Sequence, residues 1–272
     1  MRALITGAGG FVGGHLSAYL LTHTDWELLG TVYPEPVEDA QPHLRLRHVH
    51  LDLRDPGRVA ELVASFAPEA VFHLAAQAIP AASFANPWDT LENNIRAQVN
   101  LLEALRRLER PSRFLVIGSN EEYGHPRSDE LPVTEDTPLR PTSPYAVSKV
   151  TQDFLGLQYH LAHGMDVVRL RPFNHTGPGQ SPRLVVPAFA SQIARVEAGL
   201  QEPVIRVGNL EVSRDFLDVR DVVRAYHLAA TAGEAGEVYN LASGHPQSLR
   251  GLLDTLLALS SISMRVEVDP TR

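Results

Sequence analysis

The sequence predicts an α/β protein that consists of a doubly wound parallel sheet and a smaller C-terminal lobe. Short apolar runs alternate with amphipathic stretches from the first residue, as expected for buried parallel strands separated by helices. The 272 residues, 44% of them hydrophobic, are enough for one large domain with an appendage. A Gly- and Pro-rich loop, NHTGPGQSPRLVVP, interrupts this alternation after about residue 174. We therefore expect a main domain over 1–174. Residues 175–272 should form mainly the smaller lobe, with some segments returning to the main sheet.

Six short runs have the character of strands: RALIT, WELLGTVY, LRHVHLD, EAVFHLA, SRFLVIGS and MDVVRLRPF. The stretches expected to form helices are FVGGHLSAYLLTH, DPGRVAELVASF, TLENNIRAQVNLLEALRRL and SPYAVSKVTQDFLGLQYHLAH. One face of the long third stretch carries Ile95, Val99, Leu102 and Leu105, which marks it as a helix that packs on the sheet. The crossovers between parallel strands should be right-handed.

The composition argues against several classes of protein. A net charge of −8 disfavours nucleic acid or an anionic membrane as a partner, and the absence of cysteine excludes disulfides and thiolate chemistry. No apolar run reaches the ~18 residues of a membrane span. The N-terminus goes straight into a strand-like run and does not resemble a signal peptide. We expect a cytoplasmic protein.

Twelve histidines raise the possibility of a metal site. His160 and His163 are three residues apart on one predicted helix, but no carboxylate completes a convincing ligand set with them. The sequence therefore predicts no metal site.

The motif TGAGGFVG, residues 6–13, joins the first strand to the first helix. Gly7 permits a tight turn, and Gly10 lets the backbone approach a pyrophosphate, which the N-terminus of the helix attracts. Gly13 lets the helix pack closely on the sheet. Between the first strand and the first helix of an α/β pattern, this spacing predicts a dinucleotide-binding turn.

The second strand does not decide between NAD and NADP. It ends at Tyr33 and Pro34, with neither the acidic residue that usually binds an NAD ribose nor an adjacent arginine for an NADP phosphate. Glu35 is the nearest acid and could be an ordinary loop charge. Asp52, after the third strand, is expected to accept a hydrogen bond from the adenine amino group, although it could instead cap the next turn. The cofactor is NADP or NAD, with NADPH favoured.

Lys149 is the single lysine among the 24 Lys and Arg residues, and it lies four residues after Tyr145 on a predicted helix. Both side chains therefore emerge on one face. A phenol with a pKa near 10 exchanges protons poorly at neutral pH, and a nearby ammonium would lower that pKa. A compact ammonium, unlike a forked guanidinium, can serve the phenol and cofactor hydroxyls together. This pair predicts proton-transfer chemistry.

Ser119 follows the strand FLVI, in the motif GSNEEYG. The carboxyl ends of parallel strands form the edge at which ligands bind, so its hydroxyl can donate a hydrogen bond to a substrate oxygen. The alternative is a serine that only forms the turn.

Together these motifs resemble the extended short-chain dehydrogenase/reductase family, in its nucleotide-sugar branch. The motifs are TGAGGFVG, HLAAQA, NNIRAQVNLLEA, GSNEEYG, YAVSK, RPFNHTGPGQ and RDFLDVRD, and they cover nearly the whole chain. The resemblance implies a Rossmann-type NAD(P)-binding domain over 1–174 and a sugar-nucleotide lobe over 175–272. It also implies a catalytic set of Ser119, Glu121, Tyr145 and Lys149. The cofactor-binding residues implied are Gly7, Gly10, Phe11, Val12, Gly13, Asp52, Leu53, Leu74, Ala75, Ala76, Tyr145, Lys149 and Pro172.

The same likeness implies a set of substrate-binding residues: Gln77, Glu121, Asn174, Val186 and Arg214. Asn174 would hold a phosphate of the nucleotide sugar, and the guanidinium of Arg214 would pair with its diphosphate. Arg214 could instead form a salt bridge to Asp215 or Asp218.

The loop signatures FNHTGPGQSP and VGNLEVSRDFLDVRD look most like the GDP-4-keto-6-deoxy-mannose reductases, close relatives of the GDP-mannose 4,6-dehydratases. We therefore expect reduction of a C4 ketone by hydride transfer, with Tyr145 as the proton donor. A dehydratase stays open, because Glu121 stands where those enzymes carry an acid/base glutamate, although it could merely orient sugar hydroxyls. Further alternatives are a sugar-nucleotide epimerase and a non-catalytic dinucleotide-binding sensor.

Two expectations concern assembly. Family members often pair through the long helix near residues 88–108 and the Tyr145 helix, so the resemblance implies a homodimer. Relatives also continue past the final residues, 269–272, and their tails commonly contact the nucleotide. We expect the base-binding side either to be incomplete or to be open to a partner chain.

Overall fold

The computed structural model describes residues 1–34 and 43–269, which fall into two compact units. The first unit comprises Met1–Pro172 and Arg220–Leu241, and the second comprises Phe173–Val219 and Ala242–Arg272. The chain thus leaves the first unit after its sixth strand and later returns to it for one helix and one strand. The ligands expected for each part remain predictions.

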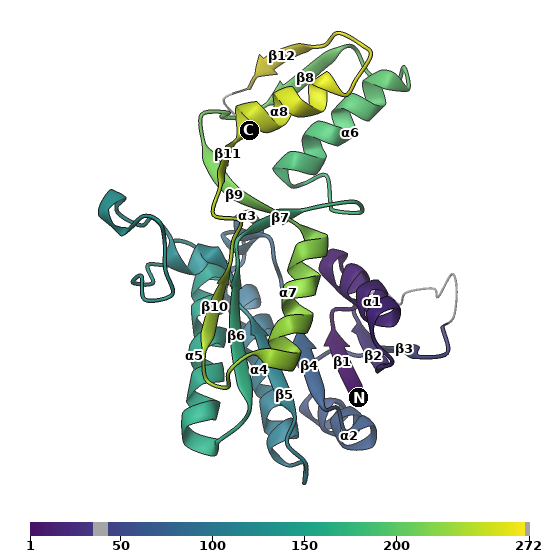
Figure 1. Cartoon of the computed structure of the whole chain (residues 1–272), viewed down its shortest axis with the longest axis vertical. Helices are drawn as coiled ribbons and strands as arrows, with labels where there is room; N and C mark the ends of the chain where they lie inside the picture. The colour runs from purple at the N-terminus through teal and green to yellow at the C-terminus, as the bar shows by residue number, and fades with distance from the viewer. Residues whose placement is uncertain (35–42, 270–272) are drawn as a thin grey trace. The chain divides into compact units, whose positions relative to one another are not determined.

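The first unit is built on seven parallel strands in the order β10-β6-β5-β4-β1-β2-β3 (Figure 1). The strands are β1 (Arg2–Thr6), β2 (Glu27–Val32), β3 (Leu46–His50), β4 (Ala70–His73), β5 (Arg113–Ile117), β6 (Val167–Pro172) and β10 (Val238–Leu241). The strand order reverses between β1 and β4, and such a switch point opens a crevice at the carboxyl ends of the strands. This is the Rossmann-type, doubly wound arrangement that the sequence predicts.

Helices cover both faces of this sheet (Figure 1). The helices of the first unit are α1 (Phe11–His23), α2 (Pro56–Phe66), α3 (Pro80–Ser83), α4 (Pro87–Arg106), α5 (Pro144–His163) and α7 (Val219–Ala232). Two short 3₁₀ helices, η1 (Asn120–Tyr123) and η2 (Ser128–Glu130), follow β5. Side chains of α2, α4 and α5 share one apolar core with β1, β4 and β5, centred on Leu4, Val71, Leu101, Leu102 and Phe114. These helices therefore cover the same face of the sheet.

Polar residues explain where three helices of the first unit begin. Asp55 caps α2, Asn86 caps α4 and Ser143 caps α5, each by accepting a backbone N–H of the first turn. A proline occupies the first position of all three helices, where its fixed φ and missing N–H are tolerated. The start of α5, the helix that carries Tyr145 and Lys149, is thus set by the local sequence.

The six strands expected from the sequence correspond to β1–β6, whereas β10 was not among the six. β10 contains only four residues, VYNL, all partly exposed, and it pairs with β6 at the edge of the sheet. A short edge strand lacks the continuous apolar run that marks a buried one. On α4, Leu102 and Leu105 are buried as expected, but Ile95 and Val99 stay partly exposed.

The second unit contains two small sheets and two helices. One sheet has the order β11-β9-β7 and the other pairs β12 with β8. Its elements are β7 (Asn174–Thr176), α6 (Val185–Glu197), β8 (Val204–Val207), β9 (Ser213–Asp218), β11 (Pro246–Ser248), α8 (Leu249–Ala258) and β12 (Arg265–Val268). Its core gathers Phe189, Ile193, Ile205, Val207 and Leu253 between α6, α8 and β8. Within residues 1–34 and 43–269, no helix is both long and apolar enough to cross a membrane.

Candidate active site

The glycine turn between β1 and α1 forms a backbone cradle. Gly7 has φ +70°, and a Cβ there would lie 3.0 Å from the backbone of Ala75. A Cβ on Gly13 would lie only 2.7 Å from the Cα of Ala8. Gly10 precedes α1 without a side chain that caps the helix, and no acidic residue occupies the first turn. A helix N-terminus that follows a glycine-rich turn and has no acidic residue in its first turn fits the pyrophosphate of a dinucleotide.

The other residues expected to bind the cofactor lie mostly at the strand ends of the first unit. Phe11 and Val12 begin α1, and Leu53 is a buried residue that follows β3. Leu74, Ala75 and Ala76 come directly after β4, and Pro172 is the last residue of β6. Because parallel strands end at the same edge of a sheet, the turn and these segments belong to that edge. Their roles in binding remain predictions.

Beyond the glycine turn, the described residues bring an unexpected arginine to the edge of the sheet. The guanidinium of Arg54 donates to Asp52, with Nη2–Oδ2 at 2.7 Å and Nε–Oδ1 at 3.0 Å. Its Nη2 also lies 3.4 Å from the hydroxyl of Tyr33, a side chain that is 51% exposed at the end of β2. The arginine lowers the pKa of the Asp52 carboxyl. Asp52 Oδ1 also accepts the backbone N–H of Arg54 at 2.9 Å, so Asp52 caps the turn that follows it, while Asp55 caps α2. Glu35 lies outside the described residues.

Sequence reasoning looked for a phosphate-binding arginine directly after β2 and so missed Arg54. The relevant signal was an arginine just beyond the neighbouring strand, β3. A guanidinium at this place suits the 2′-phosphate of NADP, because it is next to the end of the strand that normally selects between the cofactors.

Tyr145 and Lys149 both point inward from the first two turns of α5. Both are buried, and Lys149 Nζ lies 5.9 Å from the centre of the Tyr145 ring. The ammonium donates a 2.7 Å hydrogen bond to the backbone oxygen of Ile117, the last residue of β5. The side chain of Ser119, two residues further on, lies close enough to the Tyr145 phenol to lower its pKa. Ser119, Tyr145 and Lys149 thus meet at the end of β5.

The electrostatics of this group differ from the sequence expectation. We expected Lys149 to lower the pKa of Tyr145, but burial raises that pKa to about 12, against a lowering by the Ser119 side chain. Burial also lowers the pKa of Lys149 to about 8, and the nearby Glu122 opposes that shift. The expectation was wrong because it counted the charge of the neighbour and left out desolvation. At neutral pH the phenol is a protonated donor beside a largely protonated ammonium.

Two glutamates on η1 differ in their surroundings. Glu121 is partly exposed, and its charge raises the pKa of Tyr145, which places its carboxyl near the phenol. Glu122 is fully buried, and its Oε1 accepts the backbone N–H of Ser119 at 2.8 Å. Sequence reasoning considered Glu121 alone. The available signal for Glu122 was the pattern Ser119-x-x-Glu122, a capping box in which the glutamate accepts from the N-cap backbone.

Gln77 follows β4 and is bound by residues of α4. Its amide nitrogen donates to Asp89 at 2.6 Å, and its amide oxygen accepts from Thr90 at 2.9 Å. Its backbone N–H donates to the buried Asn94, which also donates to Ser148 of α5. These bonds fix the position of the loop that follows β4, while contact of Gln77 with substrate remains a prediction.

The remaining residues expected to bind substrate all lie in the second unit. Asn174 begins β7 and pairs with Phe216 of β9, two residues after Arg214. Arg214 is exposed, and its guanidinium donates to the carbonyl of Ser213 at 2.9 Å. Val186 is the second residue of α6. The strand register thus brings Asn174 and Arg214 onto neighbouring strands, as two groups that contact one diphosphate would require.

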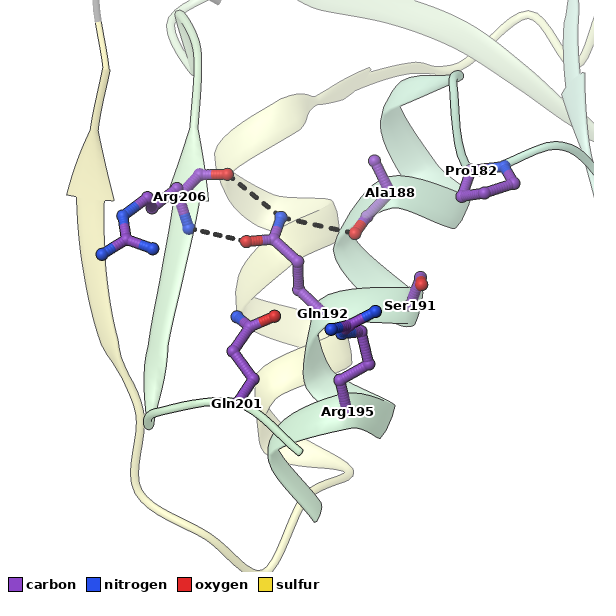
Figure 2. Close-up of a pocket in the computed structure, with 7 residues that line it drawn as sticks. All are labelled: Pro182, Ala188, Ser191, Gln192, Arg195, Gln201 and Arg206. Carbon is purple, nitrogen blue, oxygen red and sulfur yellow. Dashed lines mark hydrogen bonds between the residues drawn. The ribbon is translucent and has the colours of Figure 1, made fainter. Parts of the chain in front are cut away.

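A separate pocket in the second unit lies between α6 and β8 (Figure 2). It is lined by Pro182, Ala188, Ser191, Gln192, Arg195, Gln201 and Arg206. Figure 2 shows that the Gln192 side chain bridges the two elements: its nitrogen donates to the backbone oxygens of Ala188 and Arg206, and its oxygen accepts the Arg206 N–H. The lining is polar and shares no residue with the predicted substrate set.

Comparison with known proteins identifies the family. The family model described as GDP-mannose 4,6 dehydratase matches residues 4–269. This chain belongs to that family. The first unit of this GDP-mannose 4,6-dehydratase family member therefore carries the glycine turn and the Ser119, Tyr145 and Lys149 group. Across the described residues of this family member, no three His, Asp or Glu side chains gather as a possible metal site.

Individual relatives of this family member differ in the reactions for which they are named. The GDP-6-deoxy-D-mannose reductase of Pseudomonas aeruginosa is 41% identical over 272 residues, 100% of this chain and 84% of that protein. A dTDP-glucose 4,6-dehydratase of an Actinoplanes species is 34% identical, over 94% of this chain and 81% of that protein. A solved structure of RMD from Pseudomonas aeruginosa complexed with NADPH superposes with a TM-score of 0.87 at 40% identity, covering 98% of this chain and 85% of that one.

Proposed function

We propose that this protein is an NAD(P)H-dependent reductase of a nucleotide-sugar ketone, with the C4 ketone of GDP-4-keto-6-deoxy-mannose as its substrate. The main support for the proposal is the buried, protonated phenol of Tyr145 on α5, which lies beside Ser119 and Lys149. The same Rossmann-type unit contains the glycine turn. The 41% identity to a GDP-6-deoxy-D-mannose reductase over the full chain supports this choice of substrate.

The reduction divides the chemistry among three side chains. Tyr145 donates its phenolic proton to the ketone oxygen, and Ser119 donates a hydrogen bond to the same oxygen. Lys149 then stabilises the phenolate, because its ammonium is the nearest buried positive charge on the same helix face. When bound, NAD(P)H supplies the hydride. Desolvation strengthens each of these interactions relative to water.

The second unit supplies the groups proposed to recognise the nucleotide part of the substrate. Arg214 would bind the diphosphate through its forked guanidinium, and Asn174 on the neighbouring strand would hold a phosphate oxygen. Val186 in the first turn of α6 and Gln77 after β4 complete the proposed set.

NADPH is the cofactor form that we propose. Arg54 stands beside Tyr33 at the end of β2, where a guanidinium can pair with a 2′-phosphate. The Pseudomonas aeruginosa structure complexed with NADPH supports this preference. A Thermus thermophilus UDP-glucose 4-epimerase complex with NAD is more distant, at 28% identity with a TM-score of 0.85, over 98% of this chain and 86% of that one.

A 4,6-dehydratase is the second candidate, favoured by the position of Glu121. Dehydration requires a group that removes the C5 proton and returns a proton to the departing C6 hydroxyl, and a carboxyl group serves both steps. Glu121 is partly exposed and close enough to Tyr145 to affect its pKa. The matched family takes its description from this reaction.

We also propose a homodimer and a cytoplasmic location. Val147, Phe154 and Leu161 recur every seven residues on α5, and their side chains are 41%, 52% and 74% exposed. Residues at this spacing share one helix face, and such an apolar stripe on a helix surface is typical of a protein interface. A size measurement on Phe154→Glu against wild type would test the dimer.

Two incubations separate the candidates. The protein is mixed either with GDP-4-keto-6-deoxy-mannose and NADPH or with GDP-mannose alone, and cofactor absorbance and sugar identity are followed. A reductase consumes NADPH with the first substrate and leaves GDP-mannose unchanged. Formation of the 4-keto sugar from GDP-mannose would show that the protein is a dehydratase. Cofactor binding without turnover of either sugar would show that it is a non-catalytic sensor.

A further inference from the structure

Four buried charged side chains form a network next to Ser119, Tyr145 and Lys149 in the first unit. Glu122 from η1, Asp153 from α5, and Arg169 and Arg171 from β6 all keep less than 9% of their surface exposed. Charged side chains are rarely buried unless they are paired, and removing one partner of such a network leaves an uncompensated charge. The described mechanism uses none of these four residues.

Asp153 is the centre of the network. Its two carboxylate oxygens accept from Arg169 Nη1 at 2.6 Å and from Arg171 Nε at 2.7 Å. On α5 it lies four residues after Lys149 and eight after Tyr145, so all three side chains emerge on one face of the helix. The network is therefore anchored on the helix that carries the proton donor.

Glu122 connects this anchor to Ser119. Its Oε1 accepts the backbone N–H of Ser119 at 2.8 Å, and its Oε2 lies 3.2 Å from Arg171 Nε. That contact lacks hydrogen-bond geometry, because the N–H of Arg171 points at Asp153. Arg171 also donates to the hydroxyl of Tyr123 at 2.9 Å, which fixes the end of the same 3₁₀ helix.

Resting on the function proposed above, we propose that Glu122 is a positioning residue for the reduction. Its carboxyl, which lies beside the Arg171 guanidinium, fixes the Ser119 turn beside the Tyr145 phenol. The turn has a single side chain that fastens the Ser119 N–H to the body of the unit. Without that acceptor, the turn keeps its sequence but loses its anchor to α5 and β6.

The charged and titratable groups around Glu122 come from three elements. They are Glu121 and Tyr123 on η1, Tyr145, Lys149 and Asp153 on α5, and Arg171 on β6. Burial and the neighbouring Asp153 raise the pKa of Glu122 to about 8. The carboxyl is therefore mostly neutral at pH 7, and glutamine imitates that form while keeping the acceptor for Ser119.

A double-mutant cycle with Ser119 tests the proposal on the full chain with GDP-4-keto-6-deoxy-mannose and NADPH. We expect Glu122→Leu to lower kcat by about 10- to 100-fold and to leave NADPH affinity, measured by titration of cofactor fluorescence, within about twofold of wild type. In a Ser119→Ala background, the same substitution should change kcat by less than about twofold, because residues that act as a unit are not additive. A full additional loss in that background would overturn the proposal.

Two further variants show whether an effect of Glu122→Leu is specific or results from misfolding. Glu130→Leu is the matched control, since Glu130 also closes a 3₁₀ helix by accepting a backbone N–H, from Arg127 at 2.8 Å, and pairs with Arg140. It should keep wild-type kcat. If Glu122→Leu fails to fold, Glu122→Gln gives the test: its amide oxygen can still accept the Ser119 N–H, so kcat should stay within about threefold of wild type. A loss of kcat as large as the one expected for Glu122→Leu would contradict the proposal. Wild type without any turnover would contradict the proposed function itself.

Discussion

The ammonium of Lys149 donates a 2.7 Å hydrogen bond to the carbonyl of Ile117, while its Nζ lies 5.9 Å from the centre of the Tyr145 ring. The hydrogen bond to the end of β5 therefore fixes the ammonium of Lys149. Tyr145 and Lys149 lie on the same helix, α5. This position suits a group that stabilises a phenolate after proton transfer. It does not make the phenol acidic beforehand, since burial dominates the pKa of Tyr145.

Lys149→Met should lower kcat for ketone reduction by about 10²- to 10⁴-fold, the range that positioned acid–base groups contribute. NADPH affinity should fall much less, because the glycine turn is untouched. Lys149→Arg should recover little, since a larger, forked guanidinium would replace a compact ammonium at a buried position. Steady-state kinetics with a cofactor titration measures both effects. Near-normal turnover of Lys149→Met would remove the lysine from the mechanism.

The pH dependence of reduction follows from two pKa values that burial shifts in opposite directions: that of Tyr145 is raised and that of Lys149 is lowered. Tyr145 stays protonated up to a pKa of about 12, so it remains a proton donor across the accessible range. Lys149 loses its charge around its pKa of about 8, and phenolate stabilisation is lost with it. The kcat should be level below pH 8 and should decline above it. A rate that rises through pH 8 and beyond would show that a deprotonated group drives the step.

Arg54→Gln should raise the KM for NADPH by about 10- to 100-fold and leave the KM for NADH nearly unchanged. The reason is the loss of a charge-assisted hydrogen bond to the 2′-phosphate, worth about 1.5–3 kcal/mol. Arg47→Gln is a suitable control, because Arg47 lies on β3 in an exposed pair with Glu27. Equal increases in both KM values would show that Arg54 only supports the loop through Asp52.

Glu122→Gln should change how stability depends on pH. The folded-state pKa of Glu122, about 8, lies above its ordinary value of 4.5. Between these values the folded state binds more protons than the unfolded state, so the carboxyl makes wild type progressively less stable as pH rises. The free energy of unfolding of the variant minus that of wild type should therefore increase from pH 5 to pH 8, by up to about 1.4 kcal/mol per pH unit. Denaturant titrations at several pH values measure this, and a constant difference would contradict the raised pKa.

Much of the fold was accessible to sequence reasoning because the strands of a parallel sheet are buried on both faces and read as apolar runs. The same logic located the glycine turn, Ser119 and the helix with Tyr145 and Lys149. The edge strand β10 escaped, since its four residues are only partly buried. β10 pairs with β6 because the chain returns from the second unit to the first, and no local sequence pattern indicates that return.

The parts of the site that were missed depend on burial and on contacts between distant segments. The pairing of Arg54 with Tyr33 joins residues from two strands, and the contact of Glu122 with Arg171 joins η1 to β6. The pKa of Tyr145 was predicted in the wrong direction because desolvation is a property of the folded environment. Residue types and their spacing therefore predicted that Ser119, Tyr145 and Lys149 lie together, but not the proton affinities of these groups.

In the proposed reduction, hydride reaches C4 of the sugar while Tyr145 gives the proton. The most direct test is turnover of GDP-4-keto-6-deoxy-mannose with NADPH that carries deuterium at the transferable position, followed by location of the label in the product. We predict label at sugar C4 for wild type, and a loss of at least about 100-fold in labelling rate for Tyr145→Phe. Label that stays in the cofactor, or labelling by Tyr145→Phe at the wild-type rate, would contradict the account.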